Sequence, residues 1–173
     1  QRKVGMEEVV EVEREMMQMN KIKGLCVFLS GAFAYGVCEL LFRGRTHITM
    51  GLLGGLTMLF MHYLNDKRRM GRSVLLSAAM GALFITVCEY IAGLILNVTL
   101  HLDVWDYSDV SFNYRGQICL KYSLRWVLIS VAGMLLDELL RRFVFRADIY
   151  FLNLGRIKDL LPVRNSKGAK AYE

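Results

Sequence analysis

Two carboxylates and one guanidinium interrupt long apolar stretches of the 173-residue chain: Glu39, Glu89 and Arg125. An ionisable group inside hydrocarbon costs several kcal/mol unless it is paired or hydrated, so it marks a functional site by default. Glu39 can pair with Arg43 one helical turn later, and Glu89 and Arg125 fall at similar depths on neighbouring antiparallel segments. We predict that these residues, with Lys121 beside them, cluster in the outer half of a helix bundle. The alternative is that Glu89 and Arg125 only lock two helices together.

The connection at residues 101–117, HLDVWDYSDVSFNYRGQ, is aromatic, acidic and too polar to cross a membrane. We expect it to fold back over the mouth of the bundle, with its hydrogen-bonding groups next to Glu89. Trp105, Tyr107 and Tyr114 are also typical of interfacial anchors that have no further role. The candidate substrate-binding residues of this outward-facing polar pocket are Glu39, Arg43, Glu89, Asn97, Trp105, Asp106, Tyr107, Asn113, Gln117 and Arg125.

A second chemistry is available to histidine, aspartate and serine side chains near the same boundary, where a lipid headgroup would be within reach. These are His47, His101, Asp103, Asp106 and Ser108. Such a set is competent for acid–base and nucleophilic catalysis, but no spacing ties it into a triad. The four cysteines form no Cys-x-x-Cys pair and have no histidine at metal-ligand spacing. We predict no metal and no cofactor, and an enzyme acting on a lipid headgroup stays as an alternative.

The elements that position these residues follow from how apolarity and charge are distributed. Apolar residues make up 54% of the chain and the mean hydropathy is +0.33, yet charged residues still make up 22%. The high apolar fraction and the ordinary charged fraction are compatible because charge is concentrated at the ends: 21 of the 38 charged residues lie in residues 1–23 and 141–173. Between these ends, about 20 apolar residues suffice for each membrane-spanning helix. The sequence therefore predicts an all-α, polytopic transmembrane bundle of about four spans, at residues 24–42, 46–65, 73–100 and 118–140.

The orientation of the bundle follows from lysine and arginine in the connections. Five precede the first span, four lie between the second and third, and eight follow the fourth, whereas the outer connections hold three. Residues 1–23 are thus predicted to be a cytoplasmic amphipathic leader, either on the membrane surface or solvated. Residues 141–173 are a basic cytoplasmic tail that includes an interfacial helix. We expect a multi-pass protein of the cell membrane whose net charge of +6 reflects topology and not a nucleic-acid partner.

The first and third spans contain two similar nine-residue segments. Residues 31–39 read GAFAYGVCE and residues 81–89 read GALFITVCE, an offset of 50 residues. The two segments run in the same direction under the predicted topology, which is typical of a parallel duplication. A chance match between apolar helices explains the same similarity, so both interpretations stay open.

Three short motifs in this order resemble one known family: RGRTH at residues 43–47, WDYS at 105–108 and GQIC at 116–119. With Asn97 and Asp137, they are similar to the bacterial family catalogued as putative type-IV ABC-transporter permeases, CmpB-like small multi-pass membrane proteins. The resemblance covers about residues 31–146. It implies an integral membrane protein in a lipid bilayer, with transport as the activity that the family name carries.

The resemblance also implies partners. The chain has no G-x-x-x-x-G-K-[ST] phosphate loop, so an ATPase would be a separate subunit. Four spans are few for a substrate path, which favours a homo-oligomer. We expect a permease-like component that binds or moves a small polar solute. Besides the membrane enzyme, a scaffold or regulator of another membrane complex remains an alternative.

Overall fold

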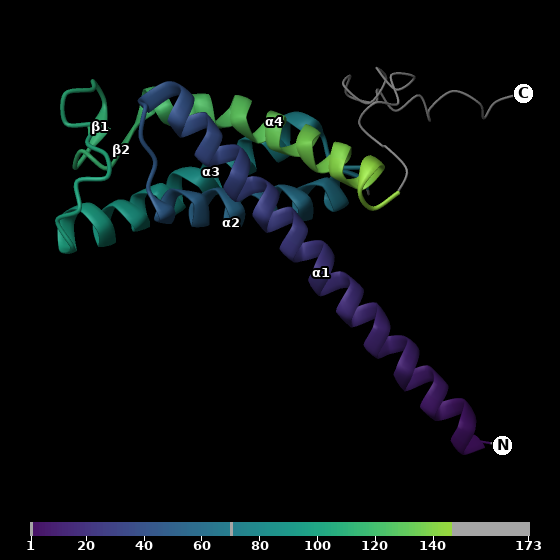
Figure 1. Ribbon diagram of the computed structural model, residues 1–173. Helices are drawn as coiled ribbons and strands as arrows, with labels where there is room; N and C mark the ends of the chain where they lie inside the picture. Colours follow the sequence, from purple (N-terminus) through teal and green to yellow (C-terminus); the bar gives the residue numbers. More distant parts are fainter. Residues whose placement is uncertain (1, 70, 147–173) are drawn as a thin grey trace, which may run out of the picture.

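The computed structural model describes residues 2–69 and 71–146 and is mostly helical (Figure 1). Its four α-helices are α1 (Arg2–Arg43), α2 (Ile48–Arg69), α3 (Val74–Gly93) and α4 (Leu120–Phe143). The π-helix η1 (Leu94–Thr99) continues α3, and a two-stranded antiparallel sheet joins β1 (Asn113–Tyr114) to β2 (Ile118–Cys119). The helical prediction is confirmed. The predicted interfacial helix of the tail lies outside the described residues.

The predicted segments 46–65, 73–100 and 118–140 each coincide with a helix. Two helical stretches in the described part of the chain are long and apolar enough to cross a membrane, Val10–Arg43 and Val74–Thr99. Helices α2 and α4 carry more polar side chains than these two stretches do, and several of them form a polar network described below. Membrane crossing by these two helices therefore remains a proposal.

Helix α1 is one uninterrupted helix of 42 residues, with no break between the leader and the first predicted span. It contains no proline, and its N-terminal half projects beyond the other helices (Figure 1). The side chains at residues 10–22 are all exposed. A helix lying along a membrane surface would have to bend before residue 24 entered the bilayer. The choice between a solvated leader and a surface helix stays a prediction.

Close approach of α1 and α2 depends on two glycines at their crossing. A Cβ atom on Gly31 would collide with the Cβ atom of Met58 and lie 2.6 Å from the carbonyl oxygen of Gly54. A Cβ atom on Gly54 would lie 2.5 Å from the Cβ atom of Tyr35. Small residues let helix backbones pack at short range, as is common between helices in membranes. This crossing sets the position of Glu39 two turns further along α1.

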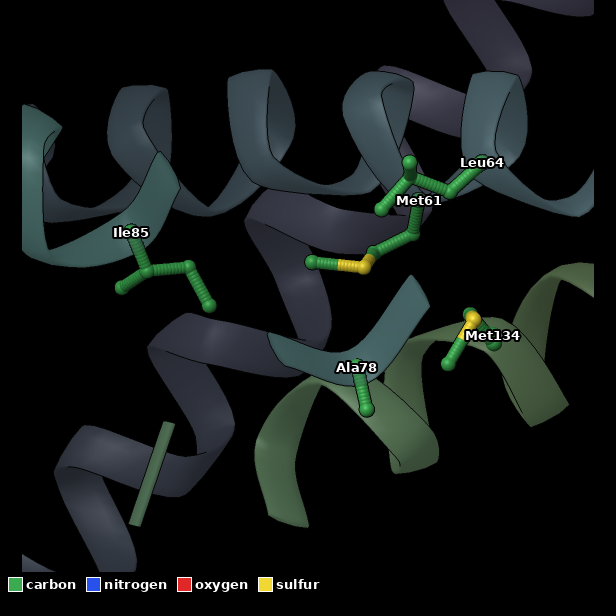
Figure 2. Packing of buried hydrophobic residues seen from close by; sticks show 5 residues of the cluster. All are labelled: Met61, Leu64, Ala78, Ile85 and Met134. Atoms are coloured by element: carbon green, nitrogen blue, oxygen red, sulfur yellow. The ribbon is translucent and has the colours of Figure 1, made fainter. Parts of the chain in front are cut away.

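The centre of the bundle joins α2, α3 and α4 through a small apolar cluster (Figure 2). Its buried members are Met61, Leu64, Ala78, Ile85 and Met134. A second cluster anchors the connection after η1, and its buried members are Met50, Leu53, Leu96 and Trp105. Methionine fills irregular gaps between helices, and Met50 and Met61 do so here, with 3% and 1% of their surfaces exposed.

Candidate functional site

Glu89 of α3 is buried, with 2% of its surface exposed, and both carboxylate oxygens are occupied. The Tyr107 hydroxyl donates to Oε1 at 2.7 Å, and the Trp126 indole Nε1 donates to Oε2 at 2.9 Å. Tyr107 belongs to the connection 101–117, and Trp126 belongs to α4. Burial, followed by the charge of Glu89, raises the pKa of Tyr107 above its ordinary value, so the hydroxyl keeps the proton that it donates. The carboxylate therefore ties the connection and α4 to α3.

The predicted ion pair between Glu89 and Arg125 is wrong. Arg125 is exposed, and its guanidinium carbon lies 5.0 Å from the centroid of the Tyr122 ring. Successive helical residues point about 100° apart, so α4 directs Trp126 into the bundle and Arg125 away from it. Lys121 is exposed as well. Matched depth placed Glu89 and Arg125 at one level but did not determine the rotation of α4 about its axis.

The pair between Glu39 and Arg43 is confirmed. Arg43 Nη1 donates to Glu39 Oε1 at 2.6 Å, and the Thr46 hydroxyl donates to Oε2 at 2.8 Å. Arg43 Nη2 also donates to the carbonyl oxygen of Val104 at 2.8 Å. Glu39 is 5% exposed. This group therefore links the end of α1 to the turn before α2 and to the connection 101–117.

Asn97, Trp105 and Gln117 bond to one another and close the outer end of the bundle. Asn97 Nδ2 donates to the Trp105 carbonyl and to Gln117 Oε1, both at 2.9 Å, and the Val104 amide donates to Asn97 Oδ1 at 2.8 Å. The Trp105 indole donates to the Gln117 carbonyl at 2.9 Å. The connection therefore folds back over the bundle as expected. Its polar groups form the hydrogen bonds that hold it in this position.

Asp106 and Asn113 shape the connection itself. Asp106 Oδ1 accepts from the Ser108 hydroxyl at 2.6 Å and from the Ser108 amide at 2.8 Å, and these bonds lower the pKa of Asp106. Asn113 Nδ2 donates to the carbonyls of Ser108 and Val110 at 3.1 and 2.8 Å. The side chains of both residues therefore form hydrogen bonds within the connection, before β2. Their role in binding a solute stays a prediction.

The His, Asp and Ser set considered for catalysis is divided into two groups, because His47 and Asp103 line one cleft while Asp106 pairs with Ser108. Ser108 is bound to Asp106, and His47 Nδ1 contacts the Thr49 hydroxyl at 2.7 Å. In the described part of the chain, no hydrogen bond joins either histidine of the set to Ser108. Among the described residues, no group of three His, Cys, Asp or Glu side chains could hold a metal ion.

The structure has a small cavity at Glu89 and an open cleft near Glu39. The cavity measures about 20 Å³, is mostly apolar and also contacts Tyr35 and Trp126. This is room for about one water molecule and not for a solute. The cleft, which we call the outer cleft, measures about 140 Å³. It is lined by Glu39, Arg43, Arg45, Thr46, His47, Leu102, Asp103 and Val104.

Only two of the ten predicted binding residues, Glu39 and Arg43, line the outer cleft. Arg45 and Asp103 also line the cleft; both are charged and exposed, and neither is among the ten predicted residues. The RGRTH motif places Arg45 in the same turn as Arg43, which is the signal in the sequence that points to it. A charged residue outside an apolar span carries no desolvation cost, so burial in hydrocarbon does not mark it as a binding residue.

A second polar cluster, which we call the inner network, lies at the opposite end of the bundle and was missed. It is formed by His62, Asn65, Asp66 and Arg68 of α2 with Asp137, Glu138 and Arg141 of α4. Asp137 has no exposed surface and accepts from His62 Nδ1 at 2.5 Å, Asn65 Nδ2 at 2.8 Å and Arg141 Nε at 2.7 Å.

The remaining contacts of the inner network extend it to both sides. Arg68 Nη2 donates to Glu138 Oε1 at 2.8 Å, with both side chains buried. Arg141 Nη1 lies 2.8 Å from Asp66 Oδ1, which is about half exposed. Charged groups are buried in pairs when desolvation of a single charge would be too costly. The inner network therefore joins α2 to α4 with charges that compensate one another.

Large apolar side chains on the outside of the helical bundle and two helices long enough to cross a membrane are typical of small helical membrane proteins. Residues 26–154 match the family described as "Putative ABC-transporter type IV", and the chain belongs to this family. The match includes α2, α3, α4, the connection and most of the apolar half of α1. The resemblance noted in the sequence is thereby confirmed. No curated protein and no solved structure matches the chain significantly.

Proposed function

We propose that the chain is the membrane-embedded component of a transporter and that it binds a small polar solute in the outer cleft. The observation that carries the proposal is the cleft itself, about 140 Å³ of open space lined by charged and polar side chains. It lies where the α1–α2 turn meets the connection 101–117. The family description supports transport as the activity.

A four-span topology with cytoplasmic termini is part of this proposal. The exterior supports it, because Phe33, Leu83 and Leu128 on three different helices are 75%, 66% and 72% exposed. Side chains of this kind are suited to contact with lipid chains and are costly in water. The helix ends that carry Glu39 and Asn97 would then face outward, and the inner network would lie near the cytoplasm.

Movement of the solute requires more than this chain. The sequence contains no phosphate-binding loop, so we propose a separate ATPase subunit at the inner end. Asn97, Trp105 and Gln117 bond to one another across the outer end of the bundle. A path would form between the chain and a second copy or another membrane subunit.

The topology can be tested by labelling single cysteines with a membrane-impermeant maleimide in a variant whose native cysteines are alanine. In intact cells we expect labelling at Asp109→Cys, and labelling at Glu13→Cys and Arg142→Cys only after permeabilisation. All three positions are exposed. Labelling of residues 13 and 109 from the same side would show an even number of crossings between them and, with α1 and α3 as the two helices apolar enough to cross, would exclude α2. Labelling of residues 109 and 142 from the same side would exclude α4.

Solute binding can be tested by filling the cleft. Leu102→Trp places a larger apolar side chain in the lining and removes no charge, and Leu100→Trp is the matched control, because Leu100 is exposed but does not line the cleft. After dialysis against a cell extract, we expect the wild type and L100W to retain the same polar solute, measured by mass spectrometry. L102W should retain at least about tenfold less, equivalent to about 1.4 kcal/mol of binding free energy.

Two outcomes would contradict solute binding in the cleft: no polar solute is retained by the wild type, or L102W retains it as well as the wild type does. A scaffold role is the second candidate, because the α1 side chains at residues 10–22 are all exposed, and the N-terminal half of this helix projects beyond the bundle (Figure 1). Equal behaviour of L102W and the wild type would favour that role.

A further inference from the structure

The outer cleft contains four charged side chains, and two of them already compensate each other. Arg43 donates to Glu39 at 2.6 Å and to the Val104 carbonyl at 2.8 Å. The second oxygen of Glu39 accepts from Thr46 at 2.8 Å. These groups are therefore part of the cleft wall, and neither charge needs a ligand.

The other two charges, Arg45 and Asp103, are available to a ligand. Arg45 comes from the turn between α1 and α2, and Asp103 comes from the connection that follows η1. Both are exposed, and within the described residues neither has a hydrogen bond or an ion pair. A guanidinium offers five donors and a carboxylate accepts on two oxygens. The cleft thus presents one positive and one negative group from two different segments.

The backbone holds Asp103 in position. Its φ of +46° lies in the left-handed region, which aspartate adopts more readily than most residues but still at a cost. The residues on both sides are fixed, since the Leu102 amide donates to the Leu96 carbonyl at 2.9 Å and the Val104 amide donates to Asn97 at 2.8 Å. Asp103 is therefore presented by a constrained segment, which lowers the ordering cost of binding.

The surroundings of the cleft indicate where its ligand comes from. Leu41, Phe42 and Ile48 flank the α1–α2 turn and are 77%, 86% and 77% exposed. Such apolar side chains at the helix ends place the cleft at the depth of lipid headgroups, provided that α1 and α2 cross the bilayer. A volume of about 140 Å³ suits a headgroup and is smaller than the pockets that hold drug-sized ligands.

We infer that the outer cleft binds a zwitterionic phosphoethanolamine group, with its phosphodiester on Arg45 and its primary ammonium on Asp103. Arginine matches phosphate oxygens in a bidentate geometry, and the carboxylate accepts from the ammonium. A ligand with only an anionic group would satisfy Arg45 but would be repelled by Asp103. This inference rests on the proposed function, since it names the class of solute for the same cleft. The group can come from a lipid or from its soluble deacylated form.

The test is calorimetric titration of the purified full chain in an uncharged detergent. The soluble probes are glycerophosphoethanolamine, glycerophosphoglycerol, which lacks the ammonium, and ethanolamine, which lacks the phosphate. We expect the first to bind at least about tenfold more tightly than either of the others. Asp103→Asn should abolish the preference for glycerophosphoethanolamine over glycerophosphoglycerol, and Arg45→Gln should weaken binding of both phosphodiesters. Asp109→Asn, an exposed aspartate of the same connection, is the matched control and should bind like the wild type.

A lipid arm separates the two sources. Tighter binding of dihexanoyl phosphatidylethanolamine than of glycerophosphoethanolamine would identify the lipid as the ligand, and equal or weaker binding would identify the soluble form. The inference is overturned if no probe binds, if both phosphodiesters bind equally to the wild type, or if D103N keeps the preference. Should this occur while L102W still loses a retained solute, the proposed function stands and only the ligand class is wrong.

Discussion

Asp137→Ala is expected to lower the free energy of unfolding by about 3 to 5 kcal/mol, the cost of breaking a buried ion pair by removing one partner. Asp137 has no exposed surface and accepts from His62, Asn65 and Arg141. Its removal takes away the acceptor that Asn65 and Arg141 share at the α2–α4 interface. The measurement is unfolding of the purified protein in mixed micelles with increasing sodium dodecyl sulfate, followed by circular dichroism.

The matched control is Asp66→Ala, which removes the other carboxylate that contacts Arg141. The Asp66 side chain is 48% exposed, so solvent screens this ion pair and we expect a loss below about 1 kcal/mol. The double variant Asp137→Ala with Arg141→Ala should lose less than the sum of the two single variants, because it removes both charges of the Asp137–Arg141 pair and the Asp66 carboxylate that remains is solvated. Similar losses for Asp66→Ala and Asp137→Ala would refute a stabilising role of the inner network.

Glu89→Ala is expected to cost about 2 to 4 kcal/mol, because it leaves two partly buried donors without an acceptor, each at about 1 to 3 kcal/mol. These donors are the Tyr107 hydroxyl and the Trp126 indole, at 2.7 and 2.9 Å. The same unfolding measurement applies. Trp126 and Tyr107 come from different elements, so we also expect the connection 101–117 to become more accessible to protease in Glu89→Ala than in the wild type.

A double-mutant cycle identifies the partner of Glu89. The change Tyr107→Phe removes the stranded hydroxyl, so Glu89→Ala and Tyr107→Phe should be coupled by about 1 kcal/mol. In contrast, Glu89→Ala and Arg125→Ala should be additive to within about 0.5 kcal/mol, because Arg125 is exposed and lies against Tyr122. A larger coupling with Arg125 than with Tyr107 would restore the ion pair predicted from the sequence.

The predicted pair of Glu39 with Arg43 is correct and the predicted pair of Glu89 with Arg125 is wrong, and both outcomes have the same physical reason. Glu39 and Arg43 are four residues apart on one helix, so helical geometry alone brings their side chains together. Glu89 and Arg125 lie on two helices, and their contact depends on how each helix is rotated about its axis. A rotation by one residue exchanges Arg125 for Trp126. Depth along the membrane normal is readable from residue counts, but rotation is not.

The inner network could not be predicted from the sequence for a similar reason, because its contacts also join two different helices. Asp137 and its partner His62 are 75 residues apart in the chain. Their contact requires α2 and α4 to pack side by side, and this packing depends on apolar neighbours such as Met61 and Met134 (Figure 2). Many weak contacts of this kind together decide which helix faces which. No single spacing in the sequence carries that information.

The sequence by itself determined the helical class, the positions of α2, α3 and α4, the local pair at the end of α1 and the family. Each of these depends on composition, on periodicity or on residues close together in the chain, which act before any tertiary contact forms. Only the tertiary structure decided that Glu89 accepts hydrogen bonds from Tyr107 and Trp126. It also decided that Asp137 joins α2 to α4 and that Arg45 and Asp103 line the same cleft. These pairings depend on helix rotation and on the path of a folded connection, and both are set by packing over the whole bundle.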